Sequence, residues 1–141
     1  MVAAVRTPET TAPVASKNTP KSLEDLLNKL LDAYFDYNAA TLRTDAQTAL
    51  NQNSAALREL LQEFPDTKFT VEGNCDERGS AEYNLALGDR RAAAAKEFLT
   101  QIGVPAERLT TISFGKERPV CTDQNENCWQ KNRRAHLTAS R

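Results

Sequence analysis

The stretch KFTVEGNCDERGSAEYNLALGDRRA, residues 68–92, contains the change of hydrophobic period that decides the fold. Residues 68–72 alternate polar and apolar side chains, which predicts a strand with one buried face. Residues 73–79 have a glycine at each end and are expected to form a loop. A helical pattern begins at about Glu82, and Gly103 is well suited to end this helix. The expected apolar stripe of the helix consists of Leu85, Ala92, Ala95, Leu99 and Ile102.

On the N-terminal side of this unit, the sequence predicts two helices and one strand. Ser22 is a suitable N-cap for a short helix that follows it. The aromatic run Ala33–Tyr37 is expected to be a strand. Thr44 and Gln47 fit a capping box, which predicts that a long helix begins there. It is expected to end at Pro65. Its expected core residues are Ala46, Leu50, Leu57, Leu60, Leu61 and Phe64.

On the C-terminal side, two further strands are expected at residues 109–114 and 135–139. The segment between them, residues 115–131, is predicted to be a long polar loop in which Trp129 acts as an anchor. The predicted order is thus β-α-β-α-β-β with a small helix in front. This order indicates an α+β domain in which a mixed four-stranded sheet has helices packed on one side.

The composition is typical of one globular domain with a polar tail. The chain has 141 residues, of which 40% are hydrophobic and 26% charged, and its formal net charge is −1. Neither half is basic enough to indicate a nucleic-acid surface. No apolar run approaches the roughly 18 residues of a membrane helix. Residues 1–21, rich in Ala, Thr and Pro, are expected to be a flexible tether, and residues 22–141 the folded domain.

The three cysteines suggest one disulfide bond. Cys121 and Cys128 enclose a short polar segment, and we expect them to pair in an oxidising compartment. Such a closure would stabilise the fold by about 2–3 kcal/mol. The alternative is a pair of neighbouring free thiols. If Cys121 and Cys128 pair, Cys75 is left without a cysteine partner.

A candidate binding site follows from the helix geometry of the opening stretch. Asn84, Gly88 and Arg91 lie on one face of the predicted helix. Long side chains on a helix lean toward its N-terminus, so Arg91 is expected to pass over Gly88 toward the loop that contains Asp76. A carboxylate and a guanidinium at this position suit a zwitterionic ligand. The alternative is that Asp76 and Arg91 pair with one another and serve only the structure.

Several motifs, taken in order along the chain, resemble the OmpA C-terminal-like family. The DERG and GKERP pieces, residues 76–79 and 115–119, resemble its branch of peptidoglycan-associated lipoproteins. The resemblance covers residues 33–139 and implies the OmpA-like fold. The motifs that carry it are Tyr34–Asn38, Val71–Gly79, Glu82–Asn84, Gly88–Ala92, Ser113–Pro119 and Lys131–Arg134.

The resemblance implies a binding function in the bacterial cell envelope and no catalysis, cofactor or metal. In this family, an Asp and an Arg fifteen residues later bind the meso-diaminopimelate of the peptidoglycan stem; they match Asp76 and Arg91 here. Asn84 and Asn38 match secondary contacts. We expect Asp76→Ala and Arg91→Ala each to abolish binding to diaminopimelate-type cell wall and to leave the fold intact.

The resemblance also implies where such a protein works and with what. It implies a location in the periplasm and attachment to the outer membrane through an N-terminal lipid anchor that is absent from this chain. It also implies that the protein tethers that membrane to the cell wall. A TolB-like β-propeller is implied as a second partner. An alternative function is therefore a protein-interaction module of the Tol-Pal system.

Further residues are expected near the same groove. The alternative for residues 132–134 is that they only cap the last strand. Asn74-Cys75 replaces the His-Thr or His-Ala pair that often precedes the family's Asp. A cysteine hydrolase built on Cys75 and His136 is a remote alternative. A zinc site built from the cysteines and His136 lacks C-x-x-C spacing. The possible groove residues are Asp36, Cys75, Gly79, Asn132, Arg133 and Arg134.

Overall fold

The computed structural model describes residues 23–140; the expected tether and the helix cap at Ser22 lie outside the described residues. None of the helices in this part of the chain is long and apolar enough to cross a bilayer. The helices are α1 (Leu23–Leu27), α2 (Thr44–Glu63), α3 (Ala81–Gln101), the 3-10 turn η1 (Ala106–Arg108) and α4 (Glu126–Asn132). The strands are β3 (Ala33–Tyr34), β4 (Lys68–Asn74), β5 (Leu109–Gly115) and β6 (Arg134–Ser140).

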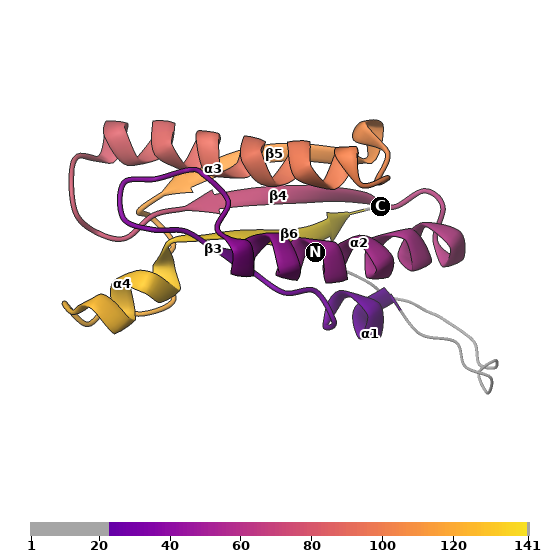
Figure 1. The fold of residues 1–141 in the computed structure, drawn as a ribbon, viewed down its shortest axis with the longest axis horizontal. Coiled ribbons are helices and arrows are strands. Elements are labelled where there is room, and N and C mark those ends of the chain that lie inside the picture. Colours follow the sequence, from indigo (N-terminus) through magenta and orange to yellow (C-terminus); the bar gives the residue numbers. More distant parts are fainter. Residues whose placement is uncertain (1–22, 141) are drawn as a thin grey trace.

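The four strands form one mixed sheet in the order β3-β6-β4-β5 (Figure 1). β4 and β5 are parallel neighbours, and α3 connects them. β6 runs antiparallel to both β4 and β3. The predicted fold class, a mixed four-stranded sheet with helices on one side, is confirmed.

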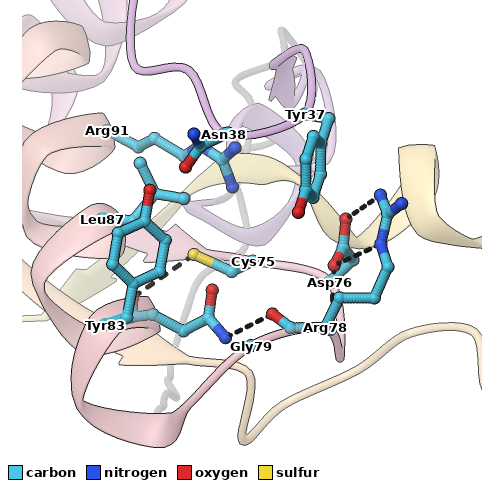
Figure 2. A pocket seen from close by; sticks show the side chains of 10 residues that line it. Tyr37, Asn38, Cys75, Asp76, Arg78, Gly79, Tyr83, Leu87 and Arg91 are labelled. Carbon is cyan, nitrogen blue, oxygen red and sulfur yellow. Dashed lines mark hydrogen bonds and ion pairs between the residues drawn. The ribbon is translucent and has the colours of Figure 1, made fainter.

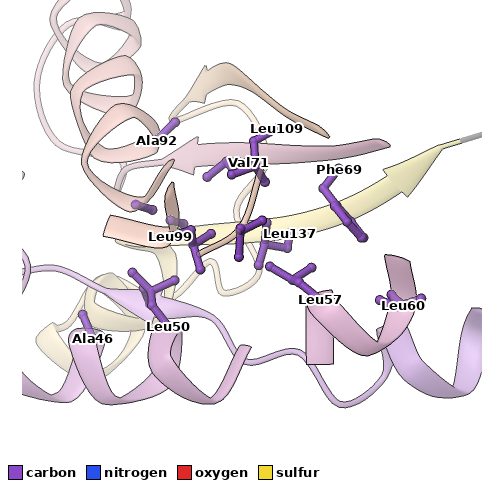
Figure 3. Close-up of a cluster of buried hydrophobic side chains, with 14 of the residues drawn as sticks. Ala46, Leu50, Leu57, Leu60, Phe69, Val71, Ala92, Leu99, Leu109 and Leu137 are labelled. Carbon is purple, nitrogen blue, oxygen red and sulfur yellow. The ribbon is translucent and has the colours of Figure 1, made fainter. Parts of the chain in front are cut away.

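The core lies between one face of the sheet and helices α2 and α3. Alternate residues of β4, Phe69 and Val71, are fully buried, and Leu137 of β6 lies opposite Val71 in the register. Figure 3 shows these side chains among Leu57 of α2 and Leu99 of α3. The opposite face of the sheet is polar and partly exposed. Its central residues are Thr70, Glu72, His136 and Thr138.

Two glycines allow α3 to lie directly on the sheet. A Cβ atom at Gly73 of β4 would overlap the backbone of Gly88 in α3. A Cβ atom at Gly88 would overlap the Ser113 side chain of β5. This close approach brings the N-terminal half of α3 against the end of β4, which is where the candidate site was predicted. Gly103, with φ of 110°, follows the end of α3 as expected.

Two predicted elements near the N-terminus are corrected. The strand expected at Ala33–Tyr37 contains only Ala33 and Tyr34, because its partner β6 begins at Arg134 and only the Phe35 N–H pairs beyond it, with the Arg133 carbonyl. The capping box at Thr44 is wrong. Thr44 is the first helical residue of α2, the N-cap is Arg43, and no side chain caps the helix. Gln47 donates instead to the Leu42 carbonyl.

Two further corrections concern α3 and the segment after β5. Leu85 is 36% exposed, whereas Leu87, which was not expected in the stripe, is 3% exposed. The buried face of α3 includes Asn84 and Arg91, and their polarity hides its true direction in the sequence. The polar segment 115–131, expected to be a loop, contains most of α4. Asn125 caps α4 by accepting a hydrogen bond from the Cys128 N–H.

Candidate ligand-binding site

A small pocket lies where β4 ends and α3 begins (Figure 2). Six of the ten residues predicted for ligand contact or for the groove line it. They are Asn38, Cys75, Asp76, Gly79, Asn84 and Arg91. Four lining residues were not predicted for the site. They are Tyr37, Arg78, Tyr83 and Leu87.

Arg91 is the largest fully buried side chain among the described residues. Its Nε donates to the Ala39 carbonyl at 2.8 Å, Nη1 to the Asn74 carbonyl at 3.0 Å and Nη2 to the Asp36 carbonyl at 3.0 Å. It thereby joins α3 to the end of β4 and to the segment after β3. None of the ion pairs found within residues 23–140 includes Arg91. Burial lowers the pKa of this guanidinium, so an anionic ligand would stabilise its charged form.

Asp76 is also buried, with 4% exposure, and it is bound by two other arginines. Its Oδ1 accepts from the backbone N–H and Nε of Arg78, and its Oδ2 accepts from Arg78 Nη2 at 2.8 Å and Arg133 Nη1 at 3.2 Å. Burial alone would raise the pKa of Asp76, but these hydrogen bonds outweigh it and lower the pKa below its usual value. The carboxylate is therefore ionised at neutral pH. The direct Asp76–Arg91 pair considered as an alternative is replaced by these contacts.

The charges near the pocket do not cancel. Arg78, Arg91 and Arg133 contribute three guanidinium groups, and Asp76 and Glu126 contribute two carboxylates that pair with Arg78 and Arg133. Arg91 remains as the guanidinium whose hydrogen bonds go to uncharged backbone carbonyls. The pocket therefore offers one paired carboxylate and one cation that lacks a carboxylate partner among the described residues.

Asn84 and Asn38 differ in how they contribute to the pocket. Asn84 is buried, and its Nδ2 donates to the carbonyls of Arg78 and Ser80, which fixes the loop that contains Asp76. Asn38 is exposed at the rim and has a φ of 58°, in the left-handed region that Asn tolerates. Cys75 is buried, and its thiol donates to the Asn84 carbonyl.

Arg78 is the main feature of the pocket that the sequence did not reveal. Its guanidinium lies 4.1 Å from the ring centroid of Tyr37 and 3.9 Å from that of Trp129, so two aromatic rings contact it. Trp129 is separated from Arg78 by about fifty residues in the chain, and only the position of α4 brings them together. The DERG motif pointed to the residue but not to this role.

Four predicted groove residues are absent from the pocket lining. One of them, Arg133, lies beside the pocket and binds Asp76. The Asp36 side chain pairs with Arg43, and only its backbone carbonyl contacts Arg91. Asn132 binds the backbone at Val120 and Cys121. The Arg134 guanidinium pairs with Asp32, on another part of the sheet.

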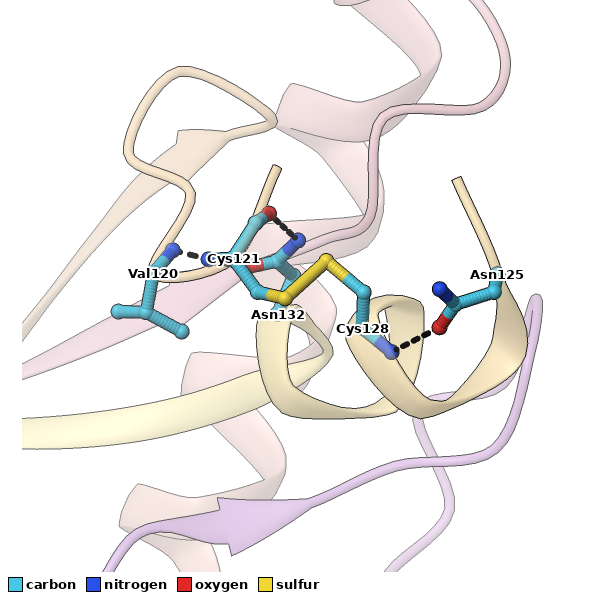
Figure 4. Close-up of a disulfide and its surroundings, with 5 residues drawn as sticks. All are labelled: Val120, Cys121, Asn125, Cys128 and Asn132. Carbon is cyan, nitrogen blue, oxygen red and sulfur yellow. Dashed lines mark hydrogen bonds between the residues drawn. A yellow bond between two sulfur atoms is a disulfide. The ribbon is translucent and has the colours of Figure 1, made fainter. Parts of the chain in front are cut away.

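The remaining chemical candidates have separate partners. His136 Nδ1 lies 2.7 Å from Asp32 Oδ1, whereas the Cys75 thiol binds Asn84, so the structure does not assemble a Cys–His pair. Across residues 23–140, no three metal-binding side chains lie close enough to hold an ion. The structure joins Cys121 and Cys128 by a disulfide bond, with a Cα–Cα separation of 5.3 Å (Figure 4).

Comparison with known proteins identifies the class to which this fold and pocket belong. A model described as the OmpA family matches residues 34–133, and the chain therefore belongs to the OmpA family. A peptidoglycan-associated lipoprotein of Agrobacterium fabrum is 46% identical over 122 residues, which cover 86% of this chain and 67% of the relative. The protein of the same name from Brucella suis is 45% identical, with 86% and 70% covered. The predicted resemblance to this branch of the family is confirmed.

Solved structures agree with this assignment. The crystal structure of the peptidoglycan-associated lipoprotein from Burkholderia pseudomallei has a TM-score of 0.71 and 34% identity, and the match covers 92% of this chain and all of that one. The C-terminal domain of Helicobacter pylori MotB has a TM-score of 0.68 over 77% of this chain and 82% of its own. At 19% identity, the MotB domain shows a shared fold alone.

Proposed function

We propose that the pocket binds the peptide stem of peptidoglycan through meso-diaminopimelate. We further propose that the protein works in the periplasm, where it tethers the outer membrane to the cell wall. The names of the relatives support the association with peptidoglycan and with a lipid-anchored location. The observation that carries the proposal is the environment of Arg91. It is a fully buried guanidinium that lacks a carboxylate partner in the described part of the chain, and it lines the same pocket as the ionised Asp76.

The ligand carboxylate is assigned to Arg91. A guanidinium has five N–H donors, and the three hydrogen bonds of Arg91 to backbone carbonyls leave donors for a ligand. The free end of diaminopimelate has an ammonium and a carboxylate on one carbon atom. A charge-assisted bond inside a pocket is stronger than one in water, because the surroundings screen it less.

The ligand ammonium is assigned to Asp76. This carboxylate accepts four hydrogen bonds in the structure, which fills its acceptor capacity. An ammonium must therefore replace one of them. Arg78 is the partner that gives way, because its side chain is 32% exposed and that of Arg133 is 3% exposed. The two aromatic rings keep Arg78 beside the pocket after this exchange.

The size of the pocket supports a side chain rather than a whole glycopeptide as the bound group. Its cavity volume of about 40 Å³ is far below the range for most ligand sites, which is roughly 300–1,000 Å³, so it admits only a small group. Leu87 contributes a buried apolar wall that suits the methylene groups of diaminopimelate. The rest of the peptide would lie outside the pocket, near Tyr37 and Tyr83, both exposed.

Calorimetric titration with two peptides tests the proposal. The peptides are a stem tripeptide that contains meso-diaminopimelate and its counterpart with lysine, which lacks the second carboxylate. Loss of one charge-assisted bond costs about 1.5–3 kcal/mol, so the lysine peptide should bind roughly 10- to 150-fold more weakly. Asp76→Asn, which keeps the shape of the side chain, should also weaken the diaminopimelate peptide. Equal affinity for the two peptides would overturn the assignment of Arg91.

Binding of a second partner, a protein, stays a prediction. A TolB-like β-propeller is implied by the family resemblance. Competition between the diaminopimelate tripeptide and such a propeller for the purified protein would distinguish a shared surface from separate ones.

A further inference from the structure

Helix α4 is held in place mainly by covalent and polar contacts. It has seven residues, of which only Cys128 and Asn132 are buried. A helix of this length is not stable by itself. The Cys121–Cys128 disulfide bonds it to the preceding loop (Figure 4). The Asn132 side chain adds hydrogen bonds to Val120 N–H at 2.7 Å and to the Cys121 carbonyl at 2.8 Å.

α4 contacts the pocket through two side chains, of which Trp129 is the first. Its ring contacts the Arg78 guanidinium, which the ring of Tyr37 also contacts. The Trp129 indole Nε1 is buried and makes no hydrogen bond within the described part of the chain. The indole and Arg78 therefore form a cation–π contact, and the indole N–H takes no part in it.

Glu126 is the second side chain of α4 that acts on the pocket. Its carboxylate binds Arg133, with Oε2 at 2.6 Å from Nη2 and Oε1 at 3.4 Å from Nη1. The same Nη1 of Arg133 donates to Asp76 Oδ2. The Arg133 Nε also donates to the Phe35 carbonyl, so Arg133 is fixed from three directions. α4 thus reaches both arginines that bind Asp76.

We infer that α4, secured by the Cys121–Cys128 disulfide, positions the pocket by holding Trp129 against Arg78 and Glu126 against Arg133. This inference rests on the proposed function, because it assigns a role to residues outside the pocket lining. Without α4, Arg78 would lose one of its two ring contacts and Arg133 its outer carboxylate. The ligand would then have to order these side chains on binding, and its affinity would fall.

Two pairs of variants test the inference. Cys121→Ser together with Cys128→Ser opens the loop, and Asp123→Ser between the cysteines serves as the control. Trp129→Leu removes the ring contact, and Trp129→Phe restores an aromatic ring. We expect the double cysteine variant and Trp129→Leu to bind the diaminopimelate tripeptide about tenfold more weakly, which corresponds to about 1.4 kcal/mol. Asp123→Ser should bind like the parent protein, and Trp129→Phe should recover most of the loss.

A readout that needs no ligand separates this inference from the proposed function. Trp129 is the single tryptophan of the chain, so its fluorescence reports its contact with Arg78 directly. The double cysteine variant should shift the emission toward that of a solvated indole, with an unchanged circular dichroism spectrum. If the parent protein does not bind the tripeptide, the proposed function fails, whatever the fluorescence shows. If the parent binds and the opened loop changes neither affinity nor emission, the positioning role of α4 is overturned.

Discussion

Arg91 has a structural role in addition to the binding role proposed for it. Helix geometry correctly directed it to the loop at the end of β4, where it meets the Asn74 carbonyl. The sequence could not reveal its other two acceptors, at Asp36 and Ala39, because they lie more than fifty residues away in a segment without regular structure. The expectation that Arg91→Ala leaves the fold intact therefore does not agree with the contacts observed.

We predict that Arg91→Ala lowers the free energy of unfolding by about 3 kcal/mol or more. The substitution opens a cavity and removes the donor from three carbonyl groups, of which that of Asn74 is buried. Arg90→Ala is the matched control, because Arg90 is the exposed neighbour on the same helix, and it should change the stability by less than about 0.5 kcal/mol. Urea denaturation measures both. Similar values for the two variants would show that the hydrogen bonds of Arg91 contribute little to stability.

His136 should make the stability depend on pH. Its hydrogen bond to Asp32 raises the pKa of the imidazole above the usual 6.5, against a smaller opposing effect of burial, with Glu72 also raising it and Arg134 lowering it. Because the folded-state pKa is the higher one, the stabilisation is complete below pH 6.5 and is lost as the pH rises through the folded-state value. The stability difference between parent and His136→Gln should therefore be larger at pH 5.5 than at pH 9. A difference that is constant between these two pH values would contradict this assignment.

At the scale of elements, regular hydrophobic period was the reliable guide. It located α2, β4, α3 and β6, because each buries an apolar face against the same core. β5 was also predicted, although it contributes only Leu109 to that core. The hydrophobic period did not predict the elements whose bounds or position depend on other contacts. The end of β3 is set by the start of its partner strand. α4 is held by a disulfide and by Asn132, neither of which leaves a period in the sequence.

The contact between α3 and the sheet leads to a prediction at this scale. In an isolated helix, Gly88→Ala would stabilise by about 1 kcal/mol. Here the added methyl would meet the Ser113 side chain and would lie 2.9 Å from the Gly73 carbonyl oxygen. Overpacking costs about 1–3 kcal/mol, so we expect a net loss of stability in thermal or urea unfolding. Adding Ser113→Ala should recover part of the loss. A stability gain in the single variant would mean that α3 can move away from the sheet.

For the whole molecule, the strongest predictions came from motifs combined along the chain. The order of elements gave the fold class, and the resemblance gave a family that the comparison confirmed. The inner ring of the pocket was predicted, since its residues share one loop and one helix face. Tyr37, from the segment after β3, joins the pocket only through tertiary structure, and so does the contact of Trp129 in α4 with Arg78 beside the pocket.

The division of the chain into tether and domain can be tested by deletion. The described structure begins at Leu23, and residues 1–20 contain no Leu, Ile, Phe, Tyr or Trp. Such a segment adds little buried apolar area. Removal of residues 1–21 should change the melting temperature by less than about 2 °C and leave the affinity for the tripeptide unchanged. A fall of more than about 5 °C in calorimetry would show that the segment belongs to the fold.

The buried position of Cys75 has a consequence for how the protein matures. Three cysteines permit three different single pairings, and only one of them is native. Cys121 and Cys128 are seven positions apart and meet early, since a short segment closes quickly. Once β4 and α3 are assembled, burial raises the pKa of the Cys75 thiol and withholds the thiolate that attacks other sulfur atoms. Folding thus removes the competing nucleophile, and oxidation in the cell envelope is guided to the correct partner without a fourth cysteine.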